Sequence, residues 1–101
     1  MAMDASKSSS PMTQDLALYH SESCWFCARV RHTISDLGLD LKLRDIDREA
    51  RAREELIAGG GKGQVPCLRI EHPAGTVEWM YESADIAAYL TRRFVTVTPP
   101  T

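Results

Sequence analysis

The chain has 101 residues, of which 44% are hydrophobic and 26% charged, and its formal net charge is -2 at pH 7. This length predicts one domain with a single hydrophobic core and argues against a multidomain enzyme. The acidic balance, with arginines interleaved with acidic residues over 47–55, excludes the basic surface of a nucleic-acid binder, and no apolar run reaches the roughly 18 residues of a membrane helix.

Both ends of the chain are expected to be tails outside the folded domain. Residues 1–14 hold a serine run before Pro11 but no apolar segment of the kind found in secretory signals, so a disordered tail is expected there, followed by one domain over 15–95 and a short tail over 96–101. The three cysteines are an odd number, and two of them lie only three positions apart. This number and spacing of cysteines argue against a secreted disulfide framework and indicate a reducing, cytoplasmic compartment.

The first half of the domain predicts a strand, a helix and a second strand. Residues 16–19 form a short apolar run that ends in a polar turn, as a buried strand does. From Cys24 onward, apolar residues recur at helical spacing as far as residue 37, and Gly38 is expected to end that helix. Alternation over residues 39–46 predicts the next strand. A strand, a helix and a further strand indicate a βαβ unit.

The second half begins with another helix. Asp47 is expected to cap it, and it should reach Ile57 before the glycines at 59–61 stop it. Pro66 then precedes a short strand over residues 67–70.

A hairpin and a final helix complete the pattern. A turn at 73–75 leads into a strand over 76–80, and the last helix opens at Ser83 with an apolar stripe that includes Ile86 and Leu90. The order β-α-β-α-β-β-α predicts an α/β protein with a four-stranded mixed sheet flanked by helices. That is the order of the thioredoxin-like fold.

Cys24-Trp25-Phe26-Cys27 stands where the first strand passes into the first helix. A thiol reacts as its thiolate, and the free N–H groups and positive dipole end of a helix N-terminus stabilise that anion. Cys27 lies one turn inward on the same face. We therefore expect Cys24 to be the nucleophile and Cys27 the resolving thiol.

These cysteines have two other interpretations. They could simply pack a small core, although a C-x-x-C beside a βαβ pattern is a redox signature. They could also bind zinc together with His32, but a structural zinc site needs about four ligands, and neither His20 nor His72 has a spacing that completes it. We therefore expect no metal at Cys24 and Cys27.

Three blocks of sequence together resemble the glutaredoxins, of the type close to the glutathione S-transferase N-terminal domain. They are Glu-Ser-Cys-Trp-Phe-Cys at 22–27, Gly-Gln-Val-Pro at 63–66, and Tyr-Glu-Ser-Ala-Asp-Ile at 81–86. The resemblance implies a monomeric thiol–disulfide oxidoreductase that uses glutathione as co-substrate. Its clients would be proteins carrying glutathione mixed disulfides or disulfides, reduced through the Cys24 thiolate. Two routes for the second step are open: a second glutathione resolves the Cys24–glutathione disulfide, or Cys27 forms an internal disulfide that glutathione later reduces.

The resemblance also implies the glutathione-binding residues. It implies a cis peptide bond before Pro66 and antiparallel pairing of the Val65 backbone with the cysteine of glutathione. It implies that Glu82 and Ser83 hold the γ-glutamyl end, which suits a helix N-terminus. Ser83 could at the same time be an ordinary N-cap.

Lys62 and Asp85 leave two interpretations open. By the same resemblance, Lys62 would attract the glycyl carboxylate of glutathione and Asp85 would assist with its ammonium group. Equally, each could be a solvated surface charge.

The chain departs from the glutaredoxin pattern at two places. Trp25 and Ser21 stand where glutaredoxins commonly have proline and lysine. Trp25 is interpreted as a contact surface for partner proteins or as a cover of the active-site rim. The missing proline keeps an alternative function open, a carrier or sensor dimer in which Cys24 of two chains and two glutathiones ligate a [2Fe–2S] cluster. Cys67 is expected to pack in the core.

Overall fold

The computed structural model describes residues 13–94. Residues 1–12 of the expected N-terminal tail, residue 95 of the expected domain and the expected C-terminal tail over 96–101 lie outside the described part. In chain order the elements are β1 (Leu16–His20), α2 (Trp25–Asp36), β2 (Lys42–Asp45), α3 (Ala50–Gly60), β3 (Cys67–Glu71), β4 (Val77–Met80) and α4 (Ser83–Phe94). The predicted β-α-β-α-β-β-α order is confirmed. No helix in this part of the chain combines the length and the apolar character needed to cross a membrane.

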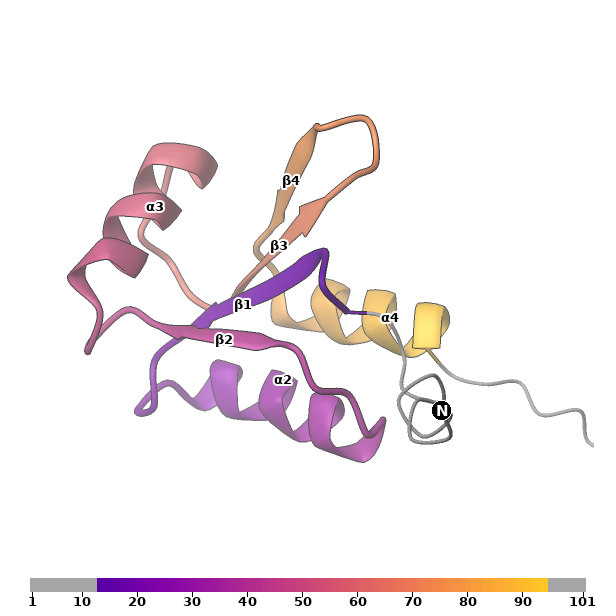
Figure 1. Ribbon diagram of the computed structural model, residues 1–101. Coiled ribbons are helices and arrows are strands. Elements are labelled where there is room, and N and C mark those ends of the chain that lie inside the picture. The colour runs from indigo at the N-terminus through magenta and orange to yellow at the C-terminus, as the bar shows by residue number, and fades with distance from the viewer. Residues whose placement is uncertain (1–12, 95–101) are drawn as a thin grey trace, which may run out of the picture.

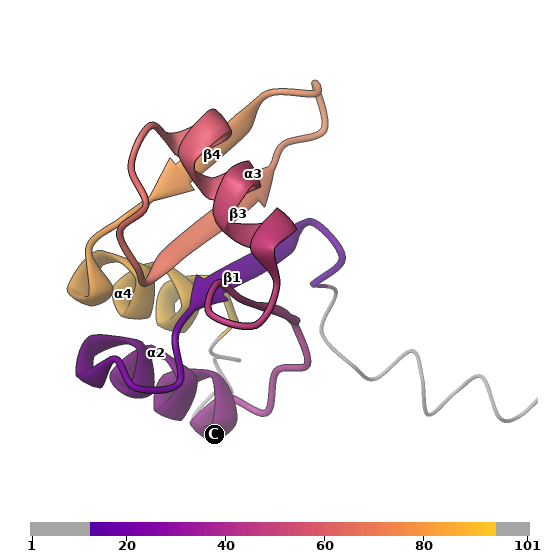
Figure 2. The ribbon, with the colours of Figure 1, turned by 90° about the vertical axis from the view of Figure 1, so that its left-hand side faces the viewer.

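The four strands form one mixed sheet in the order β2-β1-β3-β4. Strand β1 pairs in parallel with β2 and antiparallel with β3, and β3 pairs antiparallel with β4. Helices α2 and α4 lie together on one face of the sheet, and α3 lies on the other (Figures 1 and 2). This arrangement confirms the predicted thioredoxin-like α/β fold.

Strand β1 is the centre of the core because all five of its residues are buried. Its side chains alternate between two apolar clusters, as side chains on a strand must. The cluster with α2 and α4 contains Leu16, Leu18, Val30, Ile34, Leu39, Leu41, Leu68, Ile70, Ile86 and Leu90. The cluster with α3 contains Ala17, Tyr19, Ile46, Ala52, Leu56 and Cys67. Burial on both faces explains why β1 reads as a continuous apolar run.

The expected cap of α3 at Asp47 is wrong. The helix begins at Ala50 after Glu49, which makes no side-chain capping hydrogen bond. The preceding turn is instead closed by Asp45, whose carboxylate accepts the Asp47 N–H at 2.9 Å. The carboxylate of Asp47 accepts the hydroxyl of Ser21 and so ties this turn to the one that follows β1.

Helix α3 also runs further than predicted, through Gly59 and Gly60, and ends at Gly61, whose φ is 92°. Close packing against two aromatic side chains leaves no room for a side chain at either of the first two glycines. A Cβ on Gly59 would overlap the Trp79 ring, and one on Gly60 would overlap the Tyr81 hydroxyl. Of these three glycines, only Gly61 has the left-handed backbone that ends a helix.

The second strand is shorter than its alternation suggested. Only residues Lys42–Asp45 form β2, opposite Ala17 to His20 of β1. Leu39 and Leu41 are buried in the core although they precede the strand. The alternating pattern therefore predicted which side chains are buried, whereas the number of residues in the strand is set by the part of β1 that pairs with them.

Candidate active site

Cys24 directly precedes α2 and occupies its N-cap position, with an extended backbone at φ -85° and ψ 121°. Its own N–H donates to the Ser21 carbonyl at 3.2 Å, which closes the turn after β1. Its Sγ accepts the Cys27 N–H at 3.3 Å. The sulfur therefore lies at the positive end of a 12-residue helix, where a thiolate is stabilised.

The two thiols of the motif have different surroundings, and both are free. Cys24 is half-buried, whereas Cys27 is 0% exposed. Burial and the hydrogen bond with Cys24 raise the pKa of the Cys27 thiol to about 12. At neutral pH Cys27 is therefore a buried, protonated thiol one turn below an accessible one.

The loop before β3 faces Cys24. The Val65 carbonyl oxygen lies 3.9 Å from the Cys24 Sγ. The Val65–Pro66 bond is cis, which confirms the geometry that the resemblance implied. Val65 lies before β3 and outside the strand pairing. Its backbone can therefore pair with an extended ligand.

A cleft of about 140 Å³ lies beside this loop. Its lining contains Phe26, Gln64, Val65, Pro66, Tyr81, Glu82 and Ser83. The structure thus brings together four of the six predicted binding residues. Phe26, Gln64 and Tyr81 were not predicted, although each belongs to one of the three blocks that carry the resemblance. Nothing in the sequence distinguished these three residues from residues that only support the fold.

The other two predicted binding residues, Lys62 and Asp85, do not line the cleft. Lys62 is connected to it through Tyr81, because the Lys62 ammonium lies 4.6 Å from the centre of the Tyr81 ring. The Tyr81 hydroxyl also donates to the Lys62 carbonyl at 2.9 Å. Asp85 is exposed in the first turn of α4.

The N-cap of α4 is Glu82, one residue before the predicted Ser83. Ser83 is the first residue of α4, and the Ile86 N–H donates to the carbonyl of Glu82 at 2.9 Å. The N-terminus of α4 therefore borders the cleft through both Glu82 and Ser83.

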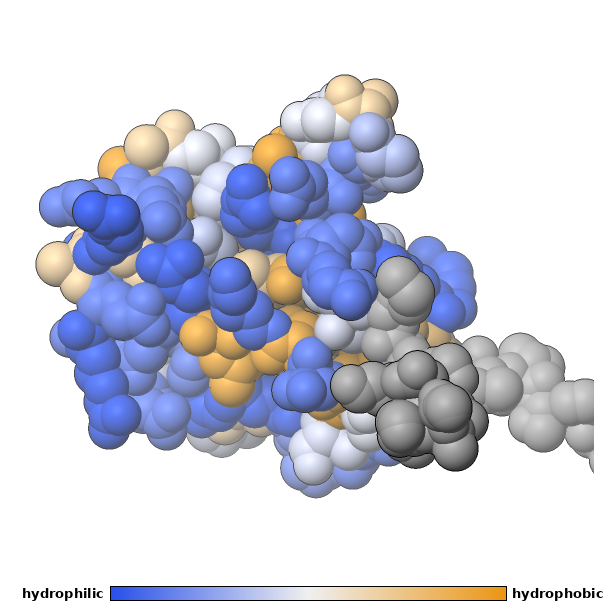
Figure 3. Space-filling model, in the orientation of Figure 1, coloured by the Kyte–Doolittle hydropathy of each residue, from blue (hydrophilic) through white to orange (hydrophobic). Residues whose placement is uncertain are grey.

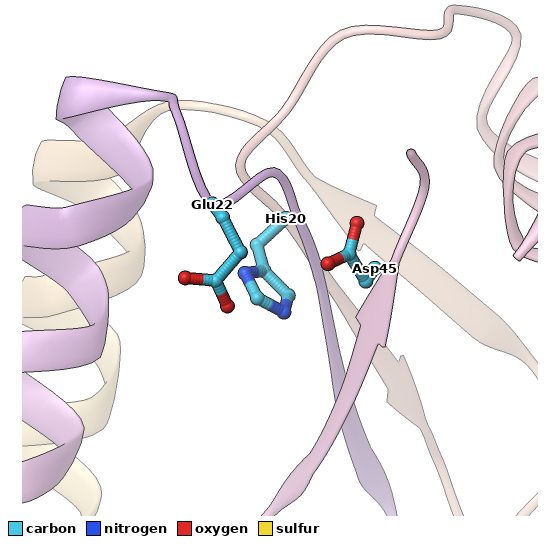
Figure 4. Close-up of side chains that lie close together, drawn as sticks. All are labelled: His20, Glu22 and Asp45. Carbon is cyan, nitrogen blue, oxygen red and sulfur yellow. The ribbon is translucent and has the colours of Figure 1, made fainter. Parts of the chain in front are cut away.

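A cluster of titratable groups lies under the turn after β1. His20, Glu22 and Asp45 have side-chain ligand atoms within 4.8 Å of one another (Figure 4). An Arg31 nitrogen lies 3.0 Å from His20 Nδ1 and donates to the Ser21 carbonyl at 3.2 Å. Burial and the Arg31 charge lower the pKa of His20.

This cluster is better explained as a hydrogen-bonded network than as a metal centre. When Arg31 donates to Nδ1, a neutral His20 ring carries its hydrogen on the other nitrogen and has no free lone pair for a cation. Cys24, Cys27 and His32 do not form a group of ligand atoms within residues 13–94. His32 Nδ1 instead lies 3.4 Å from Asp36 Oδ2.

A larger hollow of about 440 Å³ lies away from both motif cysteines, over the sheet face next to α3. Its lining includes Arg44 and Glu55, which form an ion pair at 2.9 Å. Because its lining includes none of the cysteines, size alone does not identify the reactive site.

The C-x-x-C at a helix N-terminus, opposite a cis proline, defines a thioredoxin-like thiol domain. Residues 18–98 match the family described as glutathione S-transferase, N-terminal domain, and the chain belongs to this thioredoxin-like glutaredoxin and transferase family. Glutaredoxin 3 of Escherichia coli (strain K12) is 32% identical over 57 residues, which span 56% of this chain and 69% of that protein.

Two solved structures illustrate the likeness in fold. Glutathione transferase Omega 3C from Trametes versicolor has a TM-score of 0.65 at 21% identity, over 95% of this chain and 41% of that one. Maleylacetoacetate isomerase from Anaeromyxobacter dehalogenans 2CP-1, with bound GSH in the active site, has a TM-score of 0.64 at 26% identity, over 90% and 44%. The chain thus spans about two fifths of each of these proteins.

Proposed function

We propose that the protein is a glutathione-dependent thiol–disulfide oxidoreductase that reduces protein–glutathione mixed disulfides, or protein disulfides, through the Cys24 thiolate. The observation that carries this proposal is the position of the Cys24 sulfur. It is half-buried at the N-terminus of α2, accepts the Cys27 N–H, and lies 3.9 Å from the Val65 carbonyl. The Cys24 sulfur therefore lies at a helix N-terminus and borders a cleft with free backbone groups.

The reaction on a mixed disulfide has two exchange steps. The Cys24 thiolate attacks the glutathione sulfur, a Cys24–glutathione disulfide forms, and the client thiolate leaves and takes a proton from solvent. A second glutathione thiolate then attacks the bound glutathione sulfur, which yields glutathione disulfide and regenerates the Cys24 thiolate. Two glutathione equivalents, one from the client and one from solution, become one disulfide.

We assign the second step to glutathione rather than to Cys27. Cys27 is 0% exposed, and burial is the largest cause that raises the pKa of its thiol to about 12. Exchange rates depend on the thiolate fraction of the attacking group, so Cys27 is a slow resolving thiol.

The cleft supports glutathione as the partner thiol. The bound GSH of the maleylacetoacetate isomerase and the match to glutaredoxin 3 favour the same ligand here. Val65 would pair with the cysteinyl backbone, and the N-terminus of α4 at Glu82 and Ser83 would bind the γ-glutamyl carboxylate. Lys62 would attract the glycyl carboxylate, while Asp85, outside the cleft, would act only on a ligand atom that projects beyond it. Such a reaction needs a glutathione-rich compartment such as the cytoplasm.

The test measures glutathione-dependent reduction of a small glutathione mixed disulfide by wild type, Cys24→Ser and Cys27→Ser. Wild type and Cys27→Ser should both turn over, and Cys24→Ser should not. Full activity in Cys24→Ser would refute the assignment of the nucleophile. Inactivity of wild type, together with visible iron absorbance after anaerobic reconstitution, would favour the [2Fe–2S] alternative.

A further inference from the structure

Two large aromatic side chains stand exposed next to the reactive cysteine. Trp25 is 67% exposed and Phe26 is 54% exposed, and they are two of the four large hydrophobic residues that are exposed within residues 13–94. Their rings meet edge to face, with centroids 5.3 Å apart. Adjacent exposed apolar side chains of this size are unusual unless they serve an interaction.

Packing of the fold does not explain this pair. The residues that α2 buries are Cys27, Val30 and Ile34, and these fix the helix against the sheet without Trp25 or Phe26. Phe26 instead lines the cleft beside Val65 and Pro66. The aromatic surface is therefore continuous with the proposed glutathione site.

A positive charge borders the same surface. The Arg29 guanidinium lies 5.7 Å from the centre of the Trp25 ring, one turn further along α2. No ion-pair partner of Arg29 is present within residues 13–94. A ligand on this surface thus meets an apolar platform with a cation at its edge.

We propose that Trp25, Phe26 and Arg29 form the docking surface for the client half of the mixed disulfide. This inference rests on the proposed function. During exchange the client sulfur must come within about 4 Å of the Cys24 sulfur, or two S–S bond lengths, so the client chain passes over the residues next to Cys24. With glutathione in the cleft, the Trp25 ring, which lies outside the cleft lining, and the exposed part of Phe26 border the position of the client sulfur.

The occupant is an extended protein segment with a defined composition. An apolar residue beside the glutathionylated cysteine would cover the two rings, and an acidic residue nearby would pair with Arg29. Truncation of a central tryptophan commonly costs a transient interface about a factor of ten or more in affinity. The surface therefore selects apolar, acidic client sites over basic ones.

The experiment compares kcat/KM for three substrates. One is a mixed disulfide of glutathione and 2-mercaptoethanol, and two are glutathionylated peptides with leucine beside the cysteine, flanked by glutamate in one and by lysine in the other. Trp25→Ala should lower kcat/KM for the glutamate peptide about tenfold relative to kcat/KM for the small mixed disulfide. Leu43→Ala is the matched control, because Leu43 is 44% exposed on β2, away from Cys24. Arg29→Glu should reverse the preference between the two peptides.

Five results would overturn the inference. An unchanged ratio in Trp25→Ala, or an equal fall in Leu43→Ala, would remove the docking role of Trp25. An unreversed preference in Arg29→Glu would remove its charge complementarity. A wild-type dimer that Trp25→Ala dissociates in sedimentation would assign the surface to a second copy of the chain. Wild type inactive on the small substrate would remove the proposed function, and the inference with it, which distinguishes that failure from the others.

Discussion

Alkylation of the native protein with iodoacetamide at pH 7 should modify Cys24 and leave the other two cysteines free. Cys27 and Cys67 are both 0% exposed, and the pKa of each thiol is raised to about 12. At pH 7 about one such thiol in 10⁵ is ionised, against about one in 10² for a thiol at the ordinary value of 9.0. Ionisation alone therefore slows both thiols about 10³-fold relative to an unperturbed cysteine, before loss of access is considered.

Intact-mass spectrometry over time gives the number of adducts, and peptide mapping gives their positions. The wild type should gain one adduct, on Cys24, and keep that number until it unfolds. Cys24→Ser should gain none in the native state and two in guanidinium, which shows that the remaining thiols are protected by the fold. A second adduct that grows within tenfold of the rate of the first would refute the assignment of Cys27 and Cys67 as protonated, inaccessible thiols.

Three further changes test other parts of the structure. Gly60→Ala should lower the free energy of unfolding by about 1–3 kcal/mol in urea, because its Cβ would overlap the Tyr81 hydroxyl; unchanged stability would contradict this close contact. Burial raises the pKa of Cys67 from the ordinary 9.0 to about 12 in the folded state, so the stability that its protonated thiol contributes is present below pH 9 and is lost as the pH rises toward 12. Between pH 8 and 10.5, the free energy of unfolding of Cys67→Ala should therefore fall by about 2 kcal/mol less than that of wild type. Equal falls in the two proteins would refute the buried thiol. Arg31→Gln should raise the pKa of His20, followed by its ring proton in NMR, because a neighbouring cation is removed; an unchanged titration would exclude this coupling.

The sequence predicted the elements whose signal is local. The apolar run at 16–19 became β1 because every position of that strand is buried, and the stripe with Val30 and Ile34 became the buried face of α2. The C-x-x-C needed only its position between these two elements to place Cys24 at a helix N-terminus. In each case a pattern within a few turns of chain determines the geometry.

The features that were mispredicted depend on contacts between distant segments. Asp45 and Asp47 are both good turn residues, and which one closes the turn before α3 depends on the bond between Asp47 and Ser21, 26 positions away. A glycine at position 60 reads as a helix stop until the Tyr81 hydroxyl is placed against it. Likewise, Tyr81 was not recognised as a cleft residue, because nothing local distinguishes it from a packed aromatic.

The two helices on the shared face of the sheet would allow one cleft both to bind glutathione and to react with it, as the proposed function requires. Helices α2 and α4 begin at the same end of the molecule (Figure 2). Cys24, at the N-cap of α2, lies 3.9 Å from the Val65 carbonyl oxygen, and Phe26 of α2 and Ser83 of α4 line the same cleft as Val65. Each N-terminus carries a partial positive charge. One faces the sulfur that must ionise, and the other borders the site proposed for a carboxylate, so the fold supplies electrostatic stabilisation to both without a lysine before Cys24.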